Sequence, residues 1–460
     1  MKASLLCFFA MSEQHKPQSE TGSGGHHPAW MDSVYERLAE DDEGRVCKDI
    51  SEEACRETPG NFFYTLLSNT LSNIADRLAS AKTTLPWLLL QVGAPAWALS
   101  VLVPIRESGS MLPQMFIGAL VRRQAVRKWI WVGGGFLQAL ALMAMGWSAL
   151  VLEGLPAAIV VIALLVLFSL ARGACSVAYK DVLGKTIPKT RRGRLSGWIS
   201  SISGLAAFLT GLWLGFLQDS DSLWIYAGLI FLAAGAWLLA IISYSRIIEF
   251  PGATEGGANG FTEAIARLNL LREDAPFRSF VIGRALAMGS GLVAPFYVAL
   301  ARDDLGSAAS LLGILIAAEG LAGLISSPFW GRWADRSSRL VFAAACGLSA
   351  ALSFAVVFWS LSPMPELASQ WFYPLVFFGL GVAHAGVRLG RKTYLVDMAG
   401  GNKRTDYVAV SNTVIGALLL LTGLLGALAA ALSVQLTIAL LALAGAVGTV
   451  LSLRWKEVSG

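Results

Sequence analysis

Charged side chains are scarce in this sequence. Asp, Glu, Lys and Arg make up only 15% of the 460 residues, whereas 55% of the residues are hydrophobic. A chain of this length with so little charge is too apolar to be a soluble globular protein. The net charge of +5 is unevenly spread, because residues 1–60 carry a net charge of −6 and the rest of the chain a net charge of +11.

Motifs that carry catalysis or hold a metal are also missing. There is no GxxxxGK[ST] loop to cradle a phosphate, which excludes an ATP-driven pump. No nucleophile elbow, zinc signature or paired catalytic motif is present, so the chain is not predicted to be an enzyme. The five cysteines have no metal-ligand spacing. The sequence therefore predicts neither a metal site nor a cofactor.

Long apolar runs dominate the sequence instead. Twelve of them are each long enough to cross roughly 30 Å of hydrocarbon as a helix. Few alternate strictly between apolar and polar residues, so a β-barrel is not predicted. The sequence predicts an all-α membrane protein with twelve transmembrane helices. The predicted spans are residues 66–91, 95–120, 130–152, 156–182, 195–217, 223–245, 279–301, 307–330, 340–361, 371–395, 408–431 and 435–453.

Basic residues gather in alternate loops, which predicts the orientation in the membrane. One set of loops holds the bases of residues 122–128, 185–194, 332–339 and 403–404, whereas the other set is acidic with Arg302 as its only base. Short basic loops stay in the cytoplasm, so both termini are predicted to be cytoplasmic, in a bacterial inner membrane. The same rule explains the basic excess, and a nucleic-acid partner is not predicted.

The apolar part contains an internal repeat. Tyr179–Gly211 and Arg391–Gly423 carry the same pattern at an offset of 212 residues, and the same offset places Glu107 on Glu319 and Arg127 on Arg339. A repeat of this length in a hydrophobic chain is typical of a secondary transporter built from two similar halves.

The repeat divides the chain into predicted domains. A polar, acidic and largely disordered cytoplasmic tail precedes the first half, and a polar linker joins the two halves. Within the linker, Phe261–Asp274 is predicted to form an amphipathic helix on the membrane surface. The predicted boundaries are 1–60 for the tail, 61–245 for the N-terminal bundle, 246–278 for the linker, 279–455 for the C-terminal bundle and 456–460 for the cytoplasmic end.

A loop motif follows the eighth predicted span. Residues 331–339 read GRWADRSSR, and Gly331, Asp335, Arg336 and Arg339 match the signature G-x-x-x-D-R/K-x-G-R/K-R/K of the major facilitator superfamily, which the chain resembles. The equivalent loop after the second span has Arg123 where the signature has its aspartate. The resemblance covers about residues 64–455. It implies two pseudo-symmetric six-helix bundles around a central cavity, and alternating access by rocking of one bundle on the other.

The loop motif has a physical role that does not depend on the family. Asp335 can pair with arginines of the neighbouring loop, such as Arg127, and can accept backbone N–H groups at a helix N-terminus. Such pairs on the cytoplasmic face hold one conformation closed and break in the other, so we expect a gate here. The arginines could equally serve only as topology anchors. A second gate loop is predicted at Asp181, Arg192, Asp397 and Arg404.

Two carboxylates lie inside predicted spans at equivalent repeat positions, Glu107 and Glu319. A charge at the bilayer centre costs on the order of 3 kcal/mol, so these side chains face a cavity or a partner. A carboxylate in such a place can load and release a proton, which is what proton coupling needs. The alternative is a structural pair, with Arg106 or Arg284 neutralising Glu107.

Basic residues outnumber these acids within the spans. Spans four and ten carry matching basic stripes, in which Arg172 aligns with His384 and a serine aligns with Arg388. The adjacent Asp76 and Arg77 of span one are expected to form a solvated pair near the cytoplasmic boundary. The excess of positive charge leads us to expect an anionic or zwitterionic organic substrate. The bases counted are Lys82, Arg106, Arg172, Arg284 and Arg388.

The sequence thus predicts a secondary active transporter of a small organic solute, coupled to protons. Its expected partners are the lipid bilayer, a small-molecule substrate and protons, and we expect it to function as a monomer. The alternative is a non-transporting relative of the same fold that acts as a scaffold, assembly factor or sensor through its tail. The eroded loop favours the alternative, whereas costly intramembrane charges in both halves favour transport.

Overall fold

A computed structural model describes residues 26–39, 50–112, 121, 123–216, 222–252, 268–334, 336–362, 365–398 and 403–458. These residues form helices joined by short turns, and no strand occurs among them. The helices are α1 (Trp30–Ala39), α2 (Glu52–Arg56), α3 (Thr58–Leu78), α4 (Thr84–Gln91), α5 (Trp97–Met111), α7 (Lys128–Val151), α8 (Gly154–Thr186), α9 (Lys189–Gly215), α10 (Leu223–Ser245), α12 (Leu270–Glu273), α13 (Ala275–Leu286), α14 (Gly289–Leu292), α15 (Ala294–Leu305), α16 (Ala309–Ala334), α17 (Ser338–Ser360), α18 (Glu366–Met398), α19 (Lys403–Leu432) and α20 (Val434–Leu453).

The predicted all-α layout of twelve spans is confirmed. Ten helical segments of the described residues are long and apolar enough to cross a membrane, with α13 to α15 counted as one. The two remaining spans are the first, which is divided into α3 and α4, and the second, which begins with α5. Side-chain caps start several spans: Asp274 accepts from the Phe277 amide at 2.9 Å, and Ser337 accepts from the Leu340 amide at 3.2 Å.

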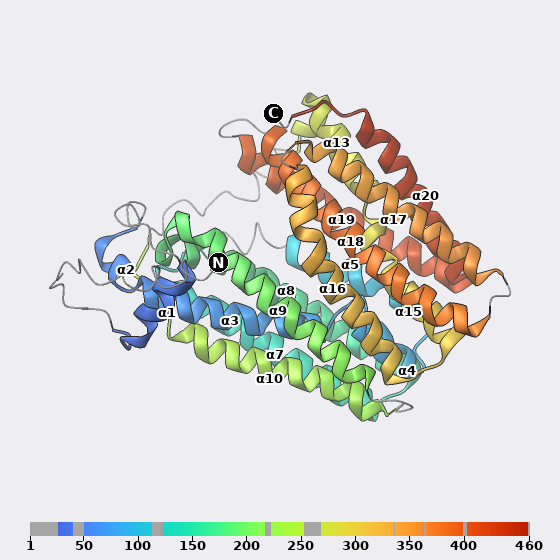
Figure 1. Cartoon of the computed structure of the whole chain (residues 1–460), viewed down its shortest axis with the longest axis horizontal. Coiled ribbons are helices and arrows are strands. Elements are labelled where there is room, and N and C mark those ends of the chain that lie inside the picture. Colours follow the sequence, from blue (N-terminus) through green and yellow to red (C-terminus); the bar gives the residue numbers. More distant parts are fainter. Residues whose placement is uncertain are drawn as a thin grey trace, which may run out of the picture.

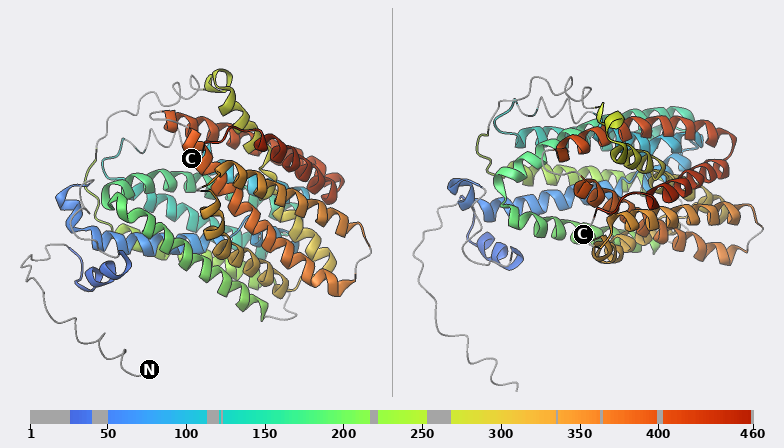
Figure 2. Two further views of the ribbon diagram at one scale, coloured as in Figure 1. Left: turned by 45° about the horizontal axis from the view of Figure 1, so that its top comes forward. Right: turned by 90° about the horizontal axis from the view of Figure 1, so that it is seen from above.

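The spans form two bundles of six, shown in Figure 1 and from two other sides in Figure 2. The N-terminal bundle holds α3 to α10 and the C-terminal bundle α13 to α20. Two pairs of helices join the bundles, α9 with α16 and α5 with α19. The bundles diverge toward the end where the chain passes from one to the other (Figure 1). We call that end the linker end and the other the opposite end.

The first span of each bundle is broken. The first ends at Leu78 and resumes at Thr84, and the seventh is interrupted between α13, α14 and α15. The sequence predicted one span at each of these places, with kinks at Pro86 and Pro295, and the structure divides both spans before these prolines. Pro86 and Pro295 lie in the first turns of α4 and α15, where a proline is tolerated, and each disfavours continuation of the helix that precedes it.

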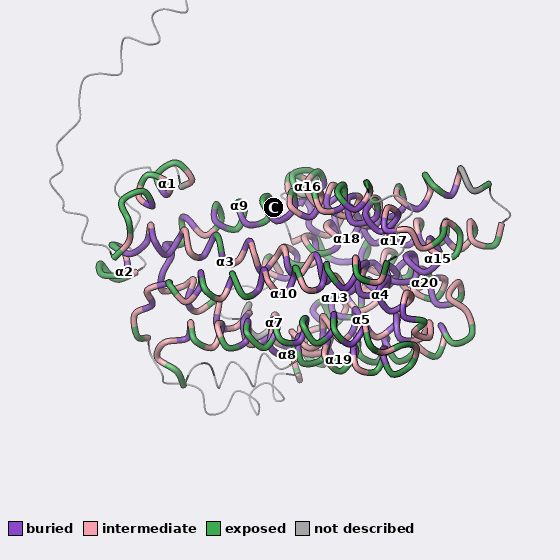
Figure 3. The backbone as a smooth tube through the Cα atoms, turned by 90° about the horizontal axis from the view of Figure 1, so that it is seen from below, coloured by how far each residue is buried: buried purple, intermediate pink, exposed green. Residues whose placement is uncertain are grey.

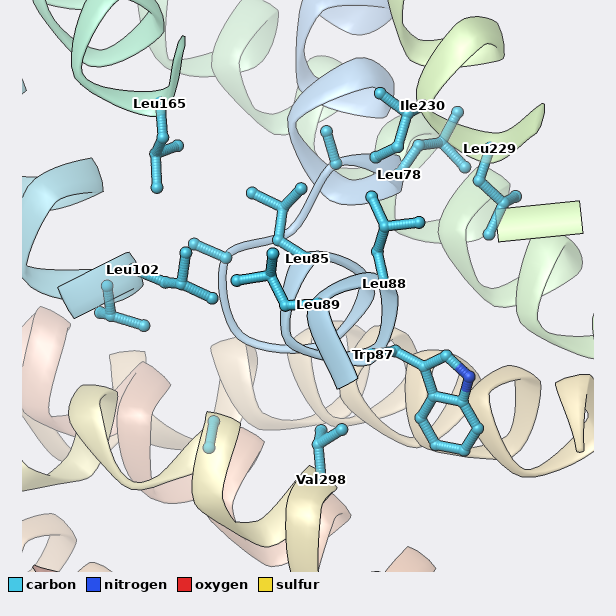
Figure 4. Close-up of a cluster of buried hydrophobic side chains, with 14 of the residues drawn as sticks. Leu78, Leu85, Trp87, Leu88, Leu89, Leu102, Leu165, Leu229, Ile230 and Val298 are labelled. Atoms are coloured by element: carbon cyan, nitrogen blue, oxygen red, sulfur yellow. The ribbon is translucent and has the colours of Figure 1, made fainter. Parts of the chain in front are cut away.

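The bundles share apolar packing at the opposite end. Figure 4 shows Leu85, Trp87, Leu88 and Leu89 of α4 surrounded by side chains of the N-terminal bundle and by Val298 of α15 in the other bundle. Large apolar side chains are exposed on the outer helices instead, including Phe216 at 83% and Leu432 at 81%. Figure 3 shows this contrast between a buried interior and an exposed outer surface, as expected for a surface that faces lipid.

The described part of the tail holds α1 and α2, and α1 packs on the N-terminal bundle. Tyr35 of α1 packs with Phe62, Leu195 and Ile199 of the N-terminal bundle, and the indole N–H of Trp198 donates to the Leu38 carbonyl at 3.3 Å. The amphipathic helix predicted at 261–274 lies largely outside the described residues, which include only its end as α12.

Candidate functional site

A cavity of about 110 Å³ lies between the two bundles, beside the breaks in their first spans. Its walls come from α3 and from the break after it on one side, and from α14, α16 and α18 on the other. The helix breaks therefore bring residues of both bundles to the same cavity, as in transporters whose discontinuous helices meet at the binding site. The polar side chains of its lining are those of Arg77, Lys82, Ser290, Glu319, His384 and Arg388.

The charged side chains of this lining have no partners. Within the part of the chain that the structure describes, Arg77, Lys82, Arg388 and Glu319 make neither a side-chain hydrogen bond nor an ion pair within 4.0 Å. Three cations thus face one carboxylate, and the His384 ring has only a 3.5 Å contact with the Ser290 hydroxyl. Unpaired charges inside a membrane protein indicate a binding site or an ion pathway.

Glu107 lies near this cluster without lining the cavity. Glu319 and Glu107 are both close enough to Lys82 to act on its charge, and Glu107 acts likewise on Arg284 and Arg391. The two carboxylates predicted from the repeat therefore belong to one electrostatic cluster. The sequence prediction included Lys82, Glu107 and Glu319, but it omitted Arg391.

Arg284 is buried without an acidic partner. Its guanidinium donates to the Ser411 hydroxyl at 2.6 Å and to the Asn412 side-chain oxygen at 3.0 Å, and its Nε has no acceptor among the described residues. With a side chain that is 5% exposed, it keeps a positive charge in the C-terminal bundle. It does not form an ion pair with Glu107, as one sequence-based alternative required.

Arg106 and Arg172 are neutralised within the N-terminal bundle. Asp76 of α3 accepts from Arg106 of α5 at 3.1 Å and from Arg172 of α8 at 2.6 Å. Both arginines also lie over aromatic rings. Asp76 was expected near the cytoplasmic boundary, and this expectation was wrong, because α3 already begins at Thr58 and carries Asp76 into the bundle.

The predicted gate residues of the N-terminal half pair within their own bundle. Arg127 forms an ion pair with Asp181 at 3.0 Å, and its backbone N–H donates to Glu249 at 2.8 Å. Lys185 reaches the same Glu249 at 2.7 Å. Arg192 instead donates to the carbonyls at the end of α8, while Arg123 is exposed.

The C-terminal half repeats part of this arrangement. Arg339, the repeat equivalent of Arg127, pairs with Glu457 at 3.3 Å, so in each half an acid that follows the sixth span meets the arginine before the third. Arg336 and Asp397 are exposed, and Gly331 lies near the end of α16. Asp335 and the side chain of Arg404 lie outside the described residues.

The opposite end carries polar contacts between the bundles that the sequence prediction missed. Arg302 of α15 donates to the Gln91 side chain at 2.6 Å and to the Trp87 carbonyl at 3.3 Å, and lies over the Trp87 ring. Tyr226 donates to the Ser307 carbonyl at 2.8 Å. The only signal in the sequence was the place of Arg302 as the single base of an otherwise acidic set of loops.

Glycines at equivalent repeat positions let the bundles approach each other. A Cβ atom on Gly211 of α9 would lie 2.5 Å from the backbone of Ala317 in α16, and one on Gly423 of α19 would lie 2.8 Å from Pro104 of α5. The two seams between the bundles are thus closely packed. Together with the contacts of Arg302, they join the bundles at the opposite end and along the middle.

Comparison with known proteins now points to a family. Residues 279–460 match the sequence model of the Major Facilitator Superfamily. This match covers the C-terminal bundle. It agrees with the expected fold of two six-helix bundles in a multi-pass membrane protein, a fold that the solved structures of transporters also have. The search of curated protein sequences finds no match.

Solved structures of three transporters resemble this chain over most of their lengths. A mutant of the nucleoside transporter NupG is 12% identical with a TM-score of 0.63, covering 85% of this chain and 99% of NupG. A POT family transporter in complex with a thioalcohol-conjugated peptide is 11% identical with a TM-score of 0.65, covering 85% and 95%. The inward-open xylose transporter XylE from E. coli is 12% identical with a TM-score of 0.59, covering 87% and 97%.

Proposed function

We propose that this protein is a secondary active transporter that moves a small anionic organic solute by alternating access, coupled to protons. The observation that carries the proposal is the cavity between the bundles, where Arg77, Lys82 and Arg388 face a single carboxylate and none of them has a partner among the described residues. A buried charge without a partner is costly, so a ligand of opposite charge is the group that stabilises these side chains.

The anion binds between the bundles in this proposal. Lys82 comes from the N-terminal bundle and Arg388 from the C-terminal bundle, and both line the same cavity. A negatively charged solute can therefore contact cations from both halves at once. Because each half supplies part of the site, rocking of one bundle on the other changes access to the solute without dismantling either half.

Glu319 supplies the coupling to protons. It is the carboxylate of the cavity lining, and its negative charge acts on Arg77 and Lys82. An ionised Glu319 competes with an anionic solute for these cations, whereas a protonated Glu319 leaves them free. Proton binding and solute binding therefore strengthen each other, and this effect is reciprocal by linkage. The expected outcome is transport of the solute and the proton in the same direction.

The positive-inside rule assigns the linker end to the cytoplasm of a bacterial cell. The segments that hold the bases of the alternate loops, before α7, between α8 and α9 and between α16 and α17, lie at this end. The described conformation, with bundles joined at the opposite end, then corresponds to an inward-facing state. Both termini are cytoplasmic in this proposal, the domain boundaries are those predicted from the sequence, and the protein functions as a monomer in the inner membrane.

The test is proton uptake by purified, detergent-solubilised protein when anionic solutes are added. Because solute and proton binding strengthen each other, wild type is expected to take up protons with one class of solute, and Glu319→Gln to lose this response because it cannot titrate. Asp181→Asn is the control, since this carboxylate pairs with Arg127 at the linker end, away from the cavity. A response that Glu319→Gln retains would contradict the assigned coupling residue.

The alternative function is a scaffold or sensor that acts through the tail. One observation favours it: α1 packs on the linker end of the N-terminal bundle and leaves Trp30 49% exposed. Deletion of residues 1–50 removes α1 and keeps α2 and α3 whole. A transporter is expected to keep its solute-dependent proton response after this deletion, whereas a scaffold loses its function.

A further inference from the structure

We infer that the transported solute is a small dianion, a dicarboxylate or a phosphomonoester, which bridges Arg77 and Lys82 of one bundle and Arg388 of the other. This inference rests on the proposed function, because it names the class of solute for the same cavity. It is carried by the number and placement of charges that have no partner among the described residues, together with the size of the cavity.

The charges of the cavity do not balance. Arg77, Lys82 and Arg388 line it with Glu319, which leaves an excess of two positive charges when the His384 ring is neutral. In the bundle interior around the cavity, Arg284 and Arg391 add two cations and Glu107 adds one carboxylate. With Glu319 ionised, a dianion neutralises the lining and a monoanion leaves one cation unpaired. With Glu319 protonated, a dianion leaves one cation unpaired and a monoanion leaves two. An unpaired cation is costly inside a membrane protein, so the dianion is favoured in both states.

The contrast with the other arginines of the spans shows that this imbalance is specific to the cavity. Arg106 and Arg172 share Asp76 at 3.1 and 2.6 Å, so half of their charge is neutralised by the protein itself. The cations of the lining have no such acid among the described residues. The protein thus neutralises intramembrane arginines where it can, and leaves three cations free at the place where a solute enters.

The placement of the three cations fits a solute with negative charge at two ends. Arg77 lies in the last turn of α3 and Lys82 in the break after it, whereas Arg388 lies on α18 across the cavity. Closing an empty cavity would bring like charges of the two bundles together. A bound dianion turns that repulsion into attraction on both sides, so it favours closure. The cavity of about 110 Å³ has room for a small solute between these cations.

A series of solutes of similar size tests directly which solute charge the protein prefers. Succinate, butyrate and 4-aminobutyrate share a four-carbon chain and carry two negative charges, one negative charge and no net charge at neutral pH. Propyl phosphate provides a second dianion of similar size. Dissociation constants are measured for the full-length, detergent-purified protein from the dependence of the unfolding temperature on solute concentration. Either dianion is expected to bind at least about tenfold more tightly than butyrate or 4-aminobutyrate.

Two variants test whether the cavity residues cause the preference for a dianion. Lys82→Gln and Arg388→Gln are each expected to weaken binding of the preferred dianion about tenfold or more and to reduce its advantage over butyrate. Lys392→Gln is the matched control, because Lys392 is an exposed base one turn further along α18 and does not line the cavity. It is expected to bind the dianion as wild type does.

Two results would overturn the inference, and they differ in what they mean for transport. Tightest binding of butyrate or 4-aminobutyrate, with loss in Lys82→Gln, contradicts a dianion and leaves the proposed anion or zwitterion transporter standing. Absence of binding by every member of the series also contradicts a small dianion. The proton-uptake experiment with Glu319→Gln then decides separately whether the protein transports another solute.

Discussion

Intramembrane charges are paired differently in the two halves of the repeat. In the N-terminal bundle, Asp76 forms ion pairs with both Arg106 and Arg172, so both arginines have an acidic partner. In the C-terminal bundle, Arg284 bonds only to neutral groups and Arg388 has no partner among the described residues. The offset of 212 residues places Asp76 on Met288 and Arg106 on Ala318, so the ion-paired group has no equivalent in the C-terminal half. The N-terminal half pairs two arginines through Asp76 and leaves Arg77 and Lys82 at the cavity, whereas the C-terminal half has no such group among the described residues.

Asp76→Asn tests most directly whether ion pairs stabilise the N-terminal half. It leaves Arg106 and Arg172 without their shared carboxylate, and we expect the free energy of unfolding to fall by about 3 kcal/mol. This is the lower part of the range for a broken buried ion pair, because the three side chains are 16–22% exposed. Thermal unfolding in detergent measures the effect. Glu319→Gln is the matched change in the other half and should alter stability by less than about 0.5 kcal/mol, since no ion pair is lost.

Gly211→Ala tests the seam that joins the two halves. The added Cβ would lie 2.5 Å from the backbone of Ala317, so α9 and α16 must separate, at a cost of about 1–3 kcal/mol. The expected result is a lower unfolding temperature and reduced transport in proteoliposomes. Gly197→Ala in the same helix has nothing within 4 Å of its new Cβ and should behave as wild type. Equal effects of the two changes would argue against a seam at Gly211.

Arg302→Ala tests the contacts between the halves at the opposite end. Loss of the hydrogen bonds to Gln91 and Trp87 destabilises the conformation that is closed at the opposite end by about 1.5–3 kcal/mol. The population that is open at the opposite end should rise about tenfold or more. Distances between spin labels at Trp224 and Trp371, exposed sites on the two bundles, report this change.

Arg123→Ala serves as the control for that experiment. Arg123 is exposed at the linker end, so its loss should leave the distances between the labels unchanged. A shift in this variant as large as that of Arg302→Ala would mean that any loss of positive charge, rather than the named contacts, controls the conformation.

The smallest expected effect concerns the tail. Glu57 accepts from His26 at 2.8 Å; burial of its carboxyl opposes ionisation, but the hydrogen bonds of His26 and His27 outweigh burial and lower the pKa of Glu57 below 4.5. A lowered pKa stabilises the docked tail above the pKa of the unfolded state, and this stabilisation is lost as pH falls through the folded pKa. Hydrogen exchange of α1 should therefore rise below about pH 4.5. In Glu57→Gln it should already be raised at neutral pH.

Several features of this protein could be predicted from the amino-acid sequence because they depend on composition and spacing. Apolar runs long enough to cross a bilayer predict the spans, since every backbone group in lipid must be satisfied inside a helix. The offset of 212 residues predicted two similar halves and placed Glu107 and Glu319 in one cluster. The loop motif with Gly331 and Arg339 indicated the superfamily whose sequence model matches residues 279–460.

Tertiary structure alone decided which charges are free and which are paired. The sequence counted Arg106 and Arg172 with Lys82 and Arg388 as one basic group, although Asp76 neutralises the first two and no described residue neutralises the others. The partner of an intramembrane charge comes from another helix, and the rotation and breaks of the helices determine whether the two side chains meet. The break after α3 that places Lys82 in the cavity wall, and the contact of Arg302 with Trp87, follow from packing between distant segments. Periodicity within one segment carries no information about such contacts.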